Sequence, residues 1–234
     1  MNRKTLIIVL AVIAAVCLAV SLYGIFIVLP VLPATQTGFS QKIFYWHLPT
    51  AIVSFIAFMV TFVASILYLI KRDYKYDTVA YCAAELGLVF GVMLMIFGIT
   101  WDYLAWGVWW TWDVRLTTYL ILLLLFGAYF FLRSMVDERG KRATYAAVFG
   151  IIAALDVPVS FFSTRLIRNV MHPVVIGGKG TGLEPEMYLW LAVSMIGFIL
   201  MYTALLLIKI DLETVKETLH DIKDRIETGG NNYA

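Results

Sequence analysis

A tryptophan-rich stretch is the part of this chain best suited to bind a large planar molecule. Five of the seven tryptophans lie in the stretch from Trp101 to Thr118, at positions 101, 106, 109, 110 and 112. Indole rings at this density predict a weakly polar surface against which a planar ligand can lie. The competing interpretation is an aromatic belt, since tryptophan is enriched where helices meet the membrane–water interface. Asp113 and Arg115, which lie beside the tryptophans, are not required by a belt and favour the binding interpretation.

Two of the three histidines lie on either side of this stretch in the sequence, at His47 and His172. Imidazole is a good iron ligand, and two imidazoles can fill both axial positions of a haem. Each histidine has an alternative interpretation as an interfacial residue that bonds to the backbone. Haem propionates need cations, which these segments supply at five positions: Lys42, Arg115, Arg165, Arg168 and Lys179. The third histidine, His220, falls in a charged C-terminal segment and is most simply a solvated residue.

The composition predicts a membrane protein that holds these residues on transmembrane helices. The chain of 234 residues is 62% hydrophobic and 15% charged, with a mean hydropathy of +0.86. Soluble domains are about half apolar and about a quarter charged. A net charge of +2 gives no basic surface for nucleic acid. The two cysteines, Cys17 and Cys82, each lie in an apolar run and are predicted to be inert buried thiols.

Six apolar runs are long enough to cross a bilayer, which takes about 20 residues. They cover approximately Thr5–Leu29, Pro49–Ile70, Val79–Thr100, Val114–Leu132, Thr144–Ser163 and Met187–Ile208. The predicted fold class is therefore an all-α integral membrane protein with six transmembrane helices. Pro49 is expected to open the second helix, because proline suits the first helical turn. We predict two domains, a membrane domain at 1–209 and a cytoplasmic amphipathic tail at 210–234.

The distribution of basic residues predicts which side of the membrane each loop occupies. Six spans put both termini on one side, and 13 of the 18 lysines and arginines lie there. The positive-inside rule therefore makes both termini cytoplasmic. The outward segments are then Pro30–Leu48, the tryptophan stretch and Thr164–Glu186. Both histidines of interest and the tryptophans are thus expected at one membrane face.

Several residues near these elements have predicted structural roles. Asp113 is expected to cap the N-terminus of the fourth span, and the GxxxG pair Gly87 and Gly91 to allow close helix packing. Asp156 and Pro158 predict a hinge or a functional acid within the fifth span. Glu85 is expected to extend towards the membrane surface.

The C-terminal tail has heptad-like apolar spacing. The apolar positions are Leu212, Val215, Leu219, Ile222 and Ile226. This pattern predicts an amphipathic helix, for a partner, for a second copy of the chain or for the membrane surface.

Catalytic motifs are missing from the sequence. The run Gly177–Gly182 has a broken Walker spacing, because Gly180 follows Lys179 where Ser or Thr is required. There is also no Ser/His/Asp set, paired CxxC or HExxH motif. We therefore expect a binding or transfer component and no enzyme.

The stretch from Trp106 to Thr117, with the sequence WGVWWTWDVRLT, resembles the tryptophan-rich WWD signature of the haem-handling proteins of cytochrome c maturation. The family pattern of one histidine in the outward segment on each side is matched by His47 and His172. Six spans and this length are similar to CcmC, the smallest type, over essentially the whole chain. The larger relatives CcmF and CcsA usually carry more spans and further histidines. Met171-His172-Pro173-Val174 departs from the usual CcmC context, so a short CcsA-like subunit is the alternative.

The resemblance implies a haem-binding maturation factor in the bacterial or archaeal inner (cytoplasmic) membrane. It implies that haem b is held at the periplasmic face, with His47 and His172 as the iron ligands. The implied haem-contacting residues of the WWD loop are Trp106, Gly107, Trp109, Trp110, Trp112, Asp113 and Arg115. The implied partners are the periplasmic haem chaperone CcmE, the ABC subunits CcmA and CcmB, and the small protein CcmD. A lyase-like part in attaching haem to the chaperone is compatible with this role.

Two other functions fit the sequence less well. A b-type electron-transfer membrane cytochrome usually sets paired histidines within facing helices, and the predicted loop positions count against it. A small-solute permease needs broken polar helices near the midplane, for which 156–158 is the sole candidate and has no inverted counterpart.

Overall fold

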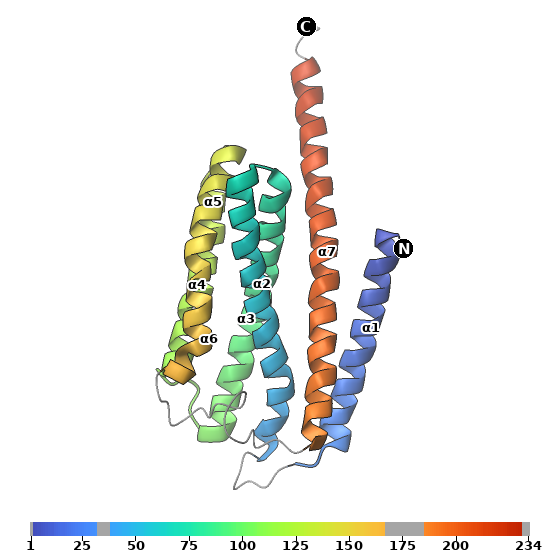
Figure 1. Cartoon of the computed structure of the whole chain (residues 1–234), viewed down its shortest axis with the longest axis vertical. Helices are drawn as coiled ribbons and strands as arrows, with labels where there is room; N and C mark the ends of the chain where they lie inside the picture. Colours follow the sequence, from blue (N-terminus) through green and yellow to red (C-terminus); the bar gives the residue numbers. More distant parts are fainter. Residues whose placement is uncertain (1, 32–37, 167–184, 231–234) are drawn as a thin grey trace.

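The protein is an all-helical bundle, which the computed structural model describes for residues 2–31, 38–166 and 185–230 (Figure 1). The elements are α1 (Arg3–Tyr23), η1 (Gly24–Val28), η2 (Gly38–Ser40), α2 (Gln41–Lys71), α3 (Tyr74–Trp106), α4 (Val114–Ser134), α5 (Arg139–Ala154), α6 (Asp156–Leu166) and α7 (Pro185–Gly230). Within these described ranges, six helical segments are long and apolar enough to cross a membrane: α1 with η1, α2, α3, α4, α5 with α6, and α7. The predicted number of spanning helices is thereby confirmed.

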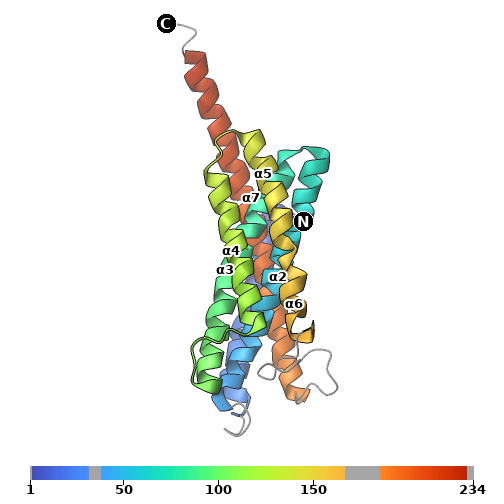
Figure 2. The same cartoon turned by 90° about the vertical axis from the view of Figure 1, so that its left-hand side faces the viewer.

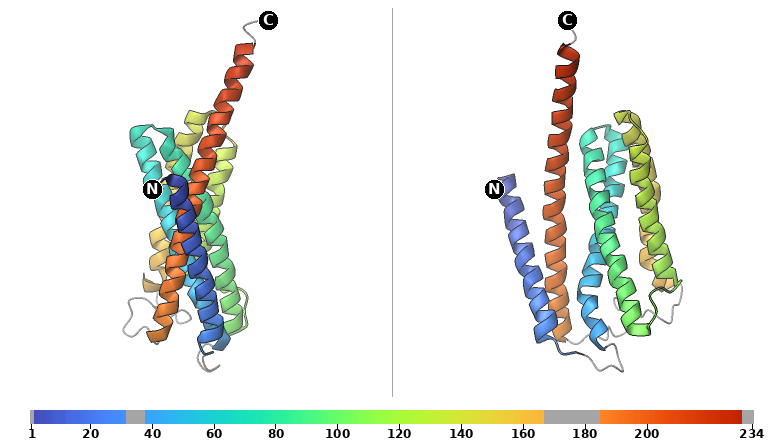
Figure 3. Two further views of the ribbon diagram at one scale, coloured as in Figure 1. Left: turned by 90° about the vertical axis from the view of Figure 1, so that its right-hand side faces the viewer. Right: turned by 180° about the vertical axis from the view of Figure 1, so that it is seen from behind.

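The antiparallel pair α2 and α3 forms the centre of the bundle (Figures 1 and 2). Helices α4, α5 and α6 pack on one side of this pair, and α7 packs on the other, with α1 outermost (Figure 3). Both chain termini lie at one end of the bundle, together with the α2–α3 and α4–α5 turns (Figure 1). We call this the terminus end; the opposite end, where α3 passes into α4, is the loop end.

The predicted GxxxG contact is confirmed in the centre of the bundle. A Cβ atom on Gly87 would lie 2.7 Å from the Phe58 ring of α2, and one on Gly91 would lie 2.5 Å from Leu123 of α4. No other residue fits at these positions without displacing its neighbours. Close approach lets the Tyr119 hydroxyl of α4 hydrogen-bond to Ser54 Oγ of α2 at 2.7 Å. The two glycines therefore fix the spacing of the three central helices.

Helix α2 starts eight residues earlier than predicted. It begins at Gln41, so Pro49 lies inside the helix and the prediction that Pro49 opens it is wrong. The early turns form because Tyr45 is fully buried and accepts a hydrogen bond from the Gln41 side chain at 2.9 Å. Pro49 has no N–H to donate, and the next residue, Thr50, bonds through its hydroxyl to the Trp46 carbonyl at 2.5 Å. Burial of an aromatic side chain thus extends the helix past its purely apolar part.

The predicted hinge in the fifth span is present as a break between α5 and α6. Helix α5 ends at Ala154, and α6 begins at Asp156. At the break the Leu155 N–H bonds to the Ile152 carbonyl at 3.2 Å, three residues back. Pro158 then falls in the first turn of α6, where a missing N–H costs nothing. The prediction of a hinge at Asp156 and Pro158 is confirmed.

Ion pairs at the terminus end join helices that are distant in the sequence. Arg133 of α4 donates two hydrogen bonds to Asp77 of α3, at 2.6 and 3.0 Å. Glu85 of α3 accepts a hydrogen bond from Lys209 of α7 at 2.6 Å. The sequence did not predict this ion pair of Glu85 with a cation on a neighbouring helix. Helix α7 passes residue 209, the predicted domain boundary, without a break.

Candidate functional site

The tryptophan stretch lies at the loop end, where α3 passes into α4 (Figure 2). Helix α3 continues to Trp106, so Trp101 and Trp106 are helical residues and the third span is longer than predicted. The helix ends because Gly107 adopts a left-handed conformation, with φ of 73°, and its N–H bonds to the Tyr103 carbonyl at 2.9 Å. Glycine adopts this conformation at little cost. The irregular connection is therefore short and is limited to residues 107–113.

The indole rings of this stretch meet edge to face or stack on a neighbouring ring, and they do not lie in a single plane. Trp101 and Trp106 meet edge to face, with ring centroids 4.9 Å apart, and Trp110 and Trp112 do so at 5.5 Å. Trp109 folds back over the last turn of α3 and stacks on Tyr103 at 4.0 Å. Trp112 is 78% exposed and Trp109 is 59% exposed. These two rings present their surfaces to the surroundings of the bundle, and the others are partly buried.

Asp113 caps helix α4, as predicted. Its Oδ1 atom accepts a hydrogen bond from the Leu116 N–H at 2.9 Å, and its Oδ2 atom accepts one from the Thr111 hydroxyl at 3.1 Å. The first bond satisfies a backbone donor at the helix start. The second ties the cap to the tryptophan connection. One carboxylate therefore determines where the loop stops and the helix begins.

We expect Asp113→Asn to be tolerated and Asp113→Ala to lower the free energy of unfolding by about 1 kcal/mol. Asparagine keeps an acceptor for the Leu116 N–H, whereas alanine removes it. Thermal unfolding of the purified variants in detergent measures the difference. Equal destabilisation by Asn and Ala would instead assign the effect to the negative charge.

His47 lies inside helix α2, so the prediction that it belongs to a loop is wrong. Its ring packs against α3 at Gly98: a Cβ atom on Gly98 would lie 3.4 Å from His47 Cε1 and 3.9 Å from Leu116 Cδ2. Leu116 is the residue whose N–H is capped by Asp113. Helices α2, α3 and α4 thus meet at Gly98, and the imidazole lies beside the start of the helix that follows the tryptophan connection.

The second predicted iron ligand, His172, lies outside the described residues. So do the side chains of Arg165, Arg168 and Lys179. Arg165 belongs to the last turn of α6, and the end of α6 and the start of α7 both lie at the loop end (Figure 1). His220 lies in the last part of α7, which extends past the terminus end, far from His47.

The two described cations of the predicted propionate set have different surroundings. Lys42 is buried and donates to the carbonyl oxygens of Phe26 and Leu29, at 3.2 and 3.1 Å. It binds carbonyl oxygens at the end of η1, so we no longer count it among the cations proposed to bind haem propionates. Arg115 lies in the first turn of α4, where it interacts electrostatically with Asp113 and Asp102. Arg115 therefore remains the described cation at the tryptophan connection.

Asp102 is a residue of this end that the sequence reasoning did not single out. It lies one helical turn after Gly98 on α3, and it is only 1% exposed. A carboxylate within the bundle is costly and marks a polar site. The sequence feature that could have pointed to Asp102 is its spacing of four residues from Gly98, which puts both residues on one face of α3. Its burial near the end of α3, one turn from the residue against which His47 packs, makes Asp102 part of the candidate site.

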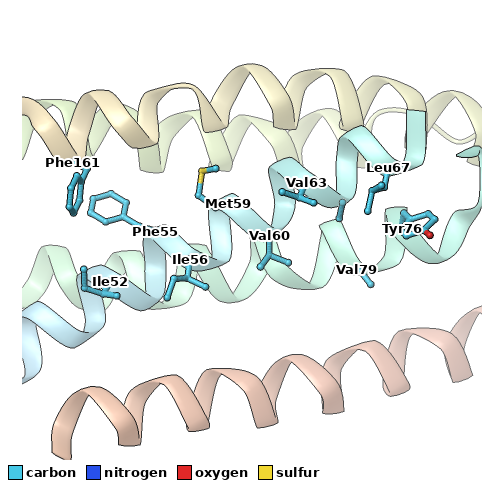
Figure 4. A pocket seen from close by; sticks show the side chains of 11 residues that line it. Ile52, Phe55, Ile56, Met59, Val60, Val63, Leu67, Tyr76, Val79 and Phe161 are labelled. Atoms are coloured by element: carbon cyan, nitrogen blue, oxygen red, sulfur yellow. The ribbon is translucent and has the colours of Figure 1, made fainter. Parts of the chain in front are cut away.

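The bundle also has a groove on its side, which is separate from the candidate site. It has a volume of about 610 Å³ and runs along α2, with Phe161 of α6 at one end and Tyr76 and Val79 of α3 at the other (Figure 4). Its lining is aliphatic and aromatic throughout, for example at Ile56 and Val63. It offers no nitrogen ligand for iron and no cation for a propionate. Lipid chains suit such a surface, and the groove is not the candidate site.

The described residues contain no group of three or more histidine, cysteine, aspartate or glutamate side chains that could hold a metal ion. A haem iron needs no such group, because the porphyrin supplies four ligands and the protein supplies one or two axial ones. Within the described ranges, His47 is the imidazole at the loop end. The donor types at this end fit a haem: an imidazole, exposed indole faces and a guanidinium.

The chain matches a known protein family over nearly its whole length. The profile of one family, described as CcmC: Heme exporter protein C, matches residues 2–224. The chain is 28% identical to heme exporter protein C of Rhodobacter capsulatus over 198 residues, 82% of this chain and 80% of that protein. It is 31% identical to the protein of the same name from Haemophilus influenzae over 187 residues, 78% of this chain and 74% of that one. The Escherichia coli K12 protein of that name is 29% identical over 174 residues, 74% of this chain and 70% of that protein.

Proposed function

Because the chain belongs to the CcmC family of heme exporter proteins, we propose that it binds haem at the loop end and hands it on for cytochrome c maturation. Six spanning helices make it a multi-pass membrane protein. The haem is cargo in this proposal, as haem b, and the chain acts as a transfer component and not as an enzyme. The site lies at the outer face of the inner membrane, and both termini lie in the cytoplasm.

One observation carries the proposal: the imidazole of His47 and the start of α4 pack against the same glycine of α3. A Cβ atom added to Gly98 would lie 3.4 Å from His47 Cε1 and 3.9 Å from Leu116 Cδ2. The cap of Leu116 is Asp113, the last residue of the tryptophan connection. The proposed iron ligand and the start of the helix that follows the tryptophan connection therefore pack against the same residue of α3, and rigid elements position a site well.

The other residues have distinct roles in the proposed site. His172 supplies the second axial ligand from the segment between α6 and α7. Trp109 and Trp112 offer exposed ring faces to the macrocycle, while Trp106, Trp110 and Gly107 shape the connection that carries them. Arg115 pairs with a propionate, because a guanidinium contacts a carboxylate through two hydrogen bonds. Asp113 holds the connection in place.

The proposed acceptor of the haem is the periplasmic chaperone CcmE. An exposed aromatic surface at the outer face lets an acceptor reach the porphyrin edge while the iron is still held. The ABC subunits CcmA and CcmB and the small protein CcmD are the proposed membrane partners. A lyase-like part in the attachment of haem to the chaperone would use the same surface.

The experiment that tests this function measures haem on two proteins at once. The chain is expressed with CcmE, and haem is quantified on the purified chain from its absorption spectrum and on CcmE as covalently attached haem. We expect a six-coordinate haem on the chain and covalent haem on CcmE only when the chain is present. A chain that binds no haem, with CcmE loaded normally, would contradict the proposal.

Topology is tested independently of haem. We expect a reporter fused at Ala234 to read as cytoplasmic and one inserted at Gly178 to read as periplasmic, because 13 of the 18 basic residues lie on the side of the termini. Alkaline phosphatase and a fluorescent protein give opposite signals in the two compartments. The reversed pair of signals would place the tryptophan connection on the inner face and rule out the proposed delivery.

A second candidate function follows from the position of His47. His47 lies inside α2 and not in a loop. One of the two proposed iron ligands therefore has the helical position that is usual in a b-type electron-transfer cytochrome. A cytochrome would keep a low-spin haem that cycles with a quinol and would not lose it to CcmE. Loss of haem from the chain on addition of CcmE distinguishes the transfer function from the cytochrome.

A further inference from the structure

The last part of α7 carries an exposed apolar stripe. Five aliphatic residues, 49–69% exposed, alternate at spacings of three and four: Leu212, Val215, Leu219, Ile222 and Ile226. These are the a and d positions of a heptad repeat, the pattern that packs one helix against another. No described element of the chain covers them. A soluble helix rarely leaves such a stripe in water unless another surface covers it.

The polar side of the same helix is held by the rest of the bundle. Glu217 accepts hydrogen bonds from Arg139 of α5 at 2.9 Å and from the Thr78 hydroxyl of α3 at 3.2 Å. Asp211 pairs with Arg3 of α1 at 2.8 Å. These contacts fix the rotation of α7 about its axis, so that the stripe faces away from the bundle.

The same contacts exclude the membrane surface as the cover of the stripe. Helix α7 is continuous from Pro185 to Gly230 and extends past the other helices along the long axis of the bundle (Figure 1). At about 1.5 Å per residue, Ile226 stands roughly 25 Å beyond Lys209, the first charged residue after the apolar run. A helix that lies in the membrane interface would have to bend sharply after Lys209. The structure shows no break there.

The charges beside the stripe indicate the chemistry of its partner. In the register set by the stripe, Lys216 and Lys223 take e positions, which flank the apolar seam, and both are exposed. Lys216 also contacts Glu213 at 2.6 Å, but an exposed pair of this kind is weak and can exchange for another carboxylate. The acidic residues Glu213 and Glu217 occupy b and f positions, away from the seam. The seam is therefore apolar, with lysines on its e side and with Asp211, Thr218 and Arg225 at its g positions, of which Asp211 pairs with Arg3.

We propose that this stripe, Leu212 to Ile226, binds an amphipathic helix of a second membrane-anchored protein whose own apolar heptads are flanked by glutamate or aspartate. Acidic flanks would pair with Lys216 and Lys223, because residues at e and g positions form ion pairs across a coiled coil. The partner helix lies on the terminus side of the membrane. The inference goes beyond haem binding and does not depend on it.

A second copy of this chain fits the stripe less well. In a parallel pair the lysines at e would face the g positions of the other copy, which are Asp211 and Thr218. Asp211 already pairs with Arg3, and threonine carries no charge. In an antiparallel pair the e positions face each other, so lysine would oppose lysine.

The short length of the stripe explains why the partner must share the membrane. Two heptads are too few for a stable helix pair in free solution, since isolated helices below about 12–15 residues are marginal. Anchoring both helices in one bilayer makes the association effectively intramolecular and raises the local concentration into the millimolar range, on the order of 1 mM. We therefore expect measurable binding only between membrane-held partners.

The test uses the full chain in phosphatidylcholine nanodiscs with lipid-anchored probe peptides. Each probe has three heptads with leucine and isoleucine in the seam, and either glutamate or lysine at every e and g position. We expect the glutamate probe to bind about tenfold more tightly than the lysine probe, as measured by energy transfer, because two ion pairs form in one case and two repulsions in the other. The variant Lys216→Glu with Lys223→Glu should reverse this preference.

Matched variants separate the stripe from the rest of the helix. Leu219→Gln with Ile222→Gln should abolish binding of the glutamate probe, and Thr214→Gln with His220→Gln on the other face should leave it unchanged. Glutamine is a good helix former, so both pairs keep α7 helical. Equal binding of the two probes would overturn the inference. Energy transfer between two copies of the chain, if the stripe variant removes it, would also overturn the inference. Protection of the stripe by anionic vesicles, without protection by the glutamate probe, would do the same.

A photocrosslinker identifies the natural occupant in cells. Placed at Ile222, it should yield a crosslinked peptide with apolar heptads and acidic flanks; at Thr214 it should not. A crosslinked peptide from this chain itself, or one without acidic flanks, would contradict the proposal.

Discussion

Replacing His47 with alanine is expected to convert the bound haem from six-coordinate to five-coordinate or to remove it altogether. The imidazole is the proposed axial ligand, and no other described histidine lies at the loop end. Alanine is the best helix former, so α2 should stay intact and the loss should concern the iron and not the fold. The absorption spectrum of the purified variant measures coordination, and exogenous imidazole should restore it in part. His172→Ala should give the same result from the opposite axial position.

His220→Ala is the matched control, because His220 is exposed in the last part of α7. It should leave the spectrum and the haem content unchanged. If His220→Ala altered coordination while His47→Ala and His172→Ala did not, the ligand assignment would be wrong. Thermal unfolding of the three variants, measured alongside, separates ligand loss from a general loss of stability.

Replacing Trp109, Trp110 and Trp112 together with leucine is expected to weaken haem retention by more than tenfold. The reason is the loss of face contacts, each of which contributes about 0.5–1.5 kcal/mol beyond the apolar area it covers. Axial coordination should not change in the fraction of haem that stays bound, because His47 lies on a different helix. Retention is measured as haem per chain after extended washing, and delivery as covalent haem on CcmE.

Tyr23→Leu serves as the control for a general aromatic belt. Tyr23 is an exposed aromatic residue at the end of α1, at the loop end but on the outermost helix. A belt predicts similar effects for Tyr23 and the three tryptophans, whereas a haem surface predicts an effect of the tryptophans alone. A triple variant that retains and delivers haem normally would leave the aromatic belt as the explanation. Normal retention with failed delivery would show that the connection mediates transfer.

The number of spanning helices was predictable from the sequence, whereas several of their ends were not. Apolar runs locate the part of a helix that contacts lipid, and all six were found in this way. The first turns of α2 instead mix polar and aromatic residues, and they are helical because Tyr45 packs in a cluster with Ile25 and Met187. Those partners lie far away in the sequence. A count of local hydropathy contains no information about them, and His47 was assigned to a loop for this reason.

The residue types of the site were predictable, and part of its arrangement was not. Tryptophan density and the Asp113 cap follow from local sequence, and the cap is confirmed. The contact of His47 with Gly98 depends on how α2 and α3 are rotated against each other, which the sequence pattern does not contain. The burial of Asp102 depends on the same rotation. Lys42 was misassigned because its carbonyl partners are Phe26 of η1 and Leu29 directly after η1.

The length of α7 has a consequence for the thermodynamics of the two sites. This single helix of 46 residues starts at Pro185, next to the segment that carries His172, and ends beyond the stripe at Gly230. A continuous helix transmits rotation and translation along its axis. If a helix bound at the stripe shifts α7 and so changes the haem affinity by some factor, haem must change the affinity of the stripe for that helix by the same factor. Measuring the affinity of the glutamate probe with and without haem therefore gives the coupling free energy between the two faces of the membrane.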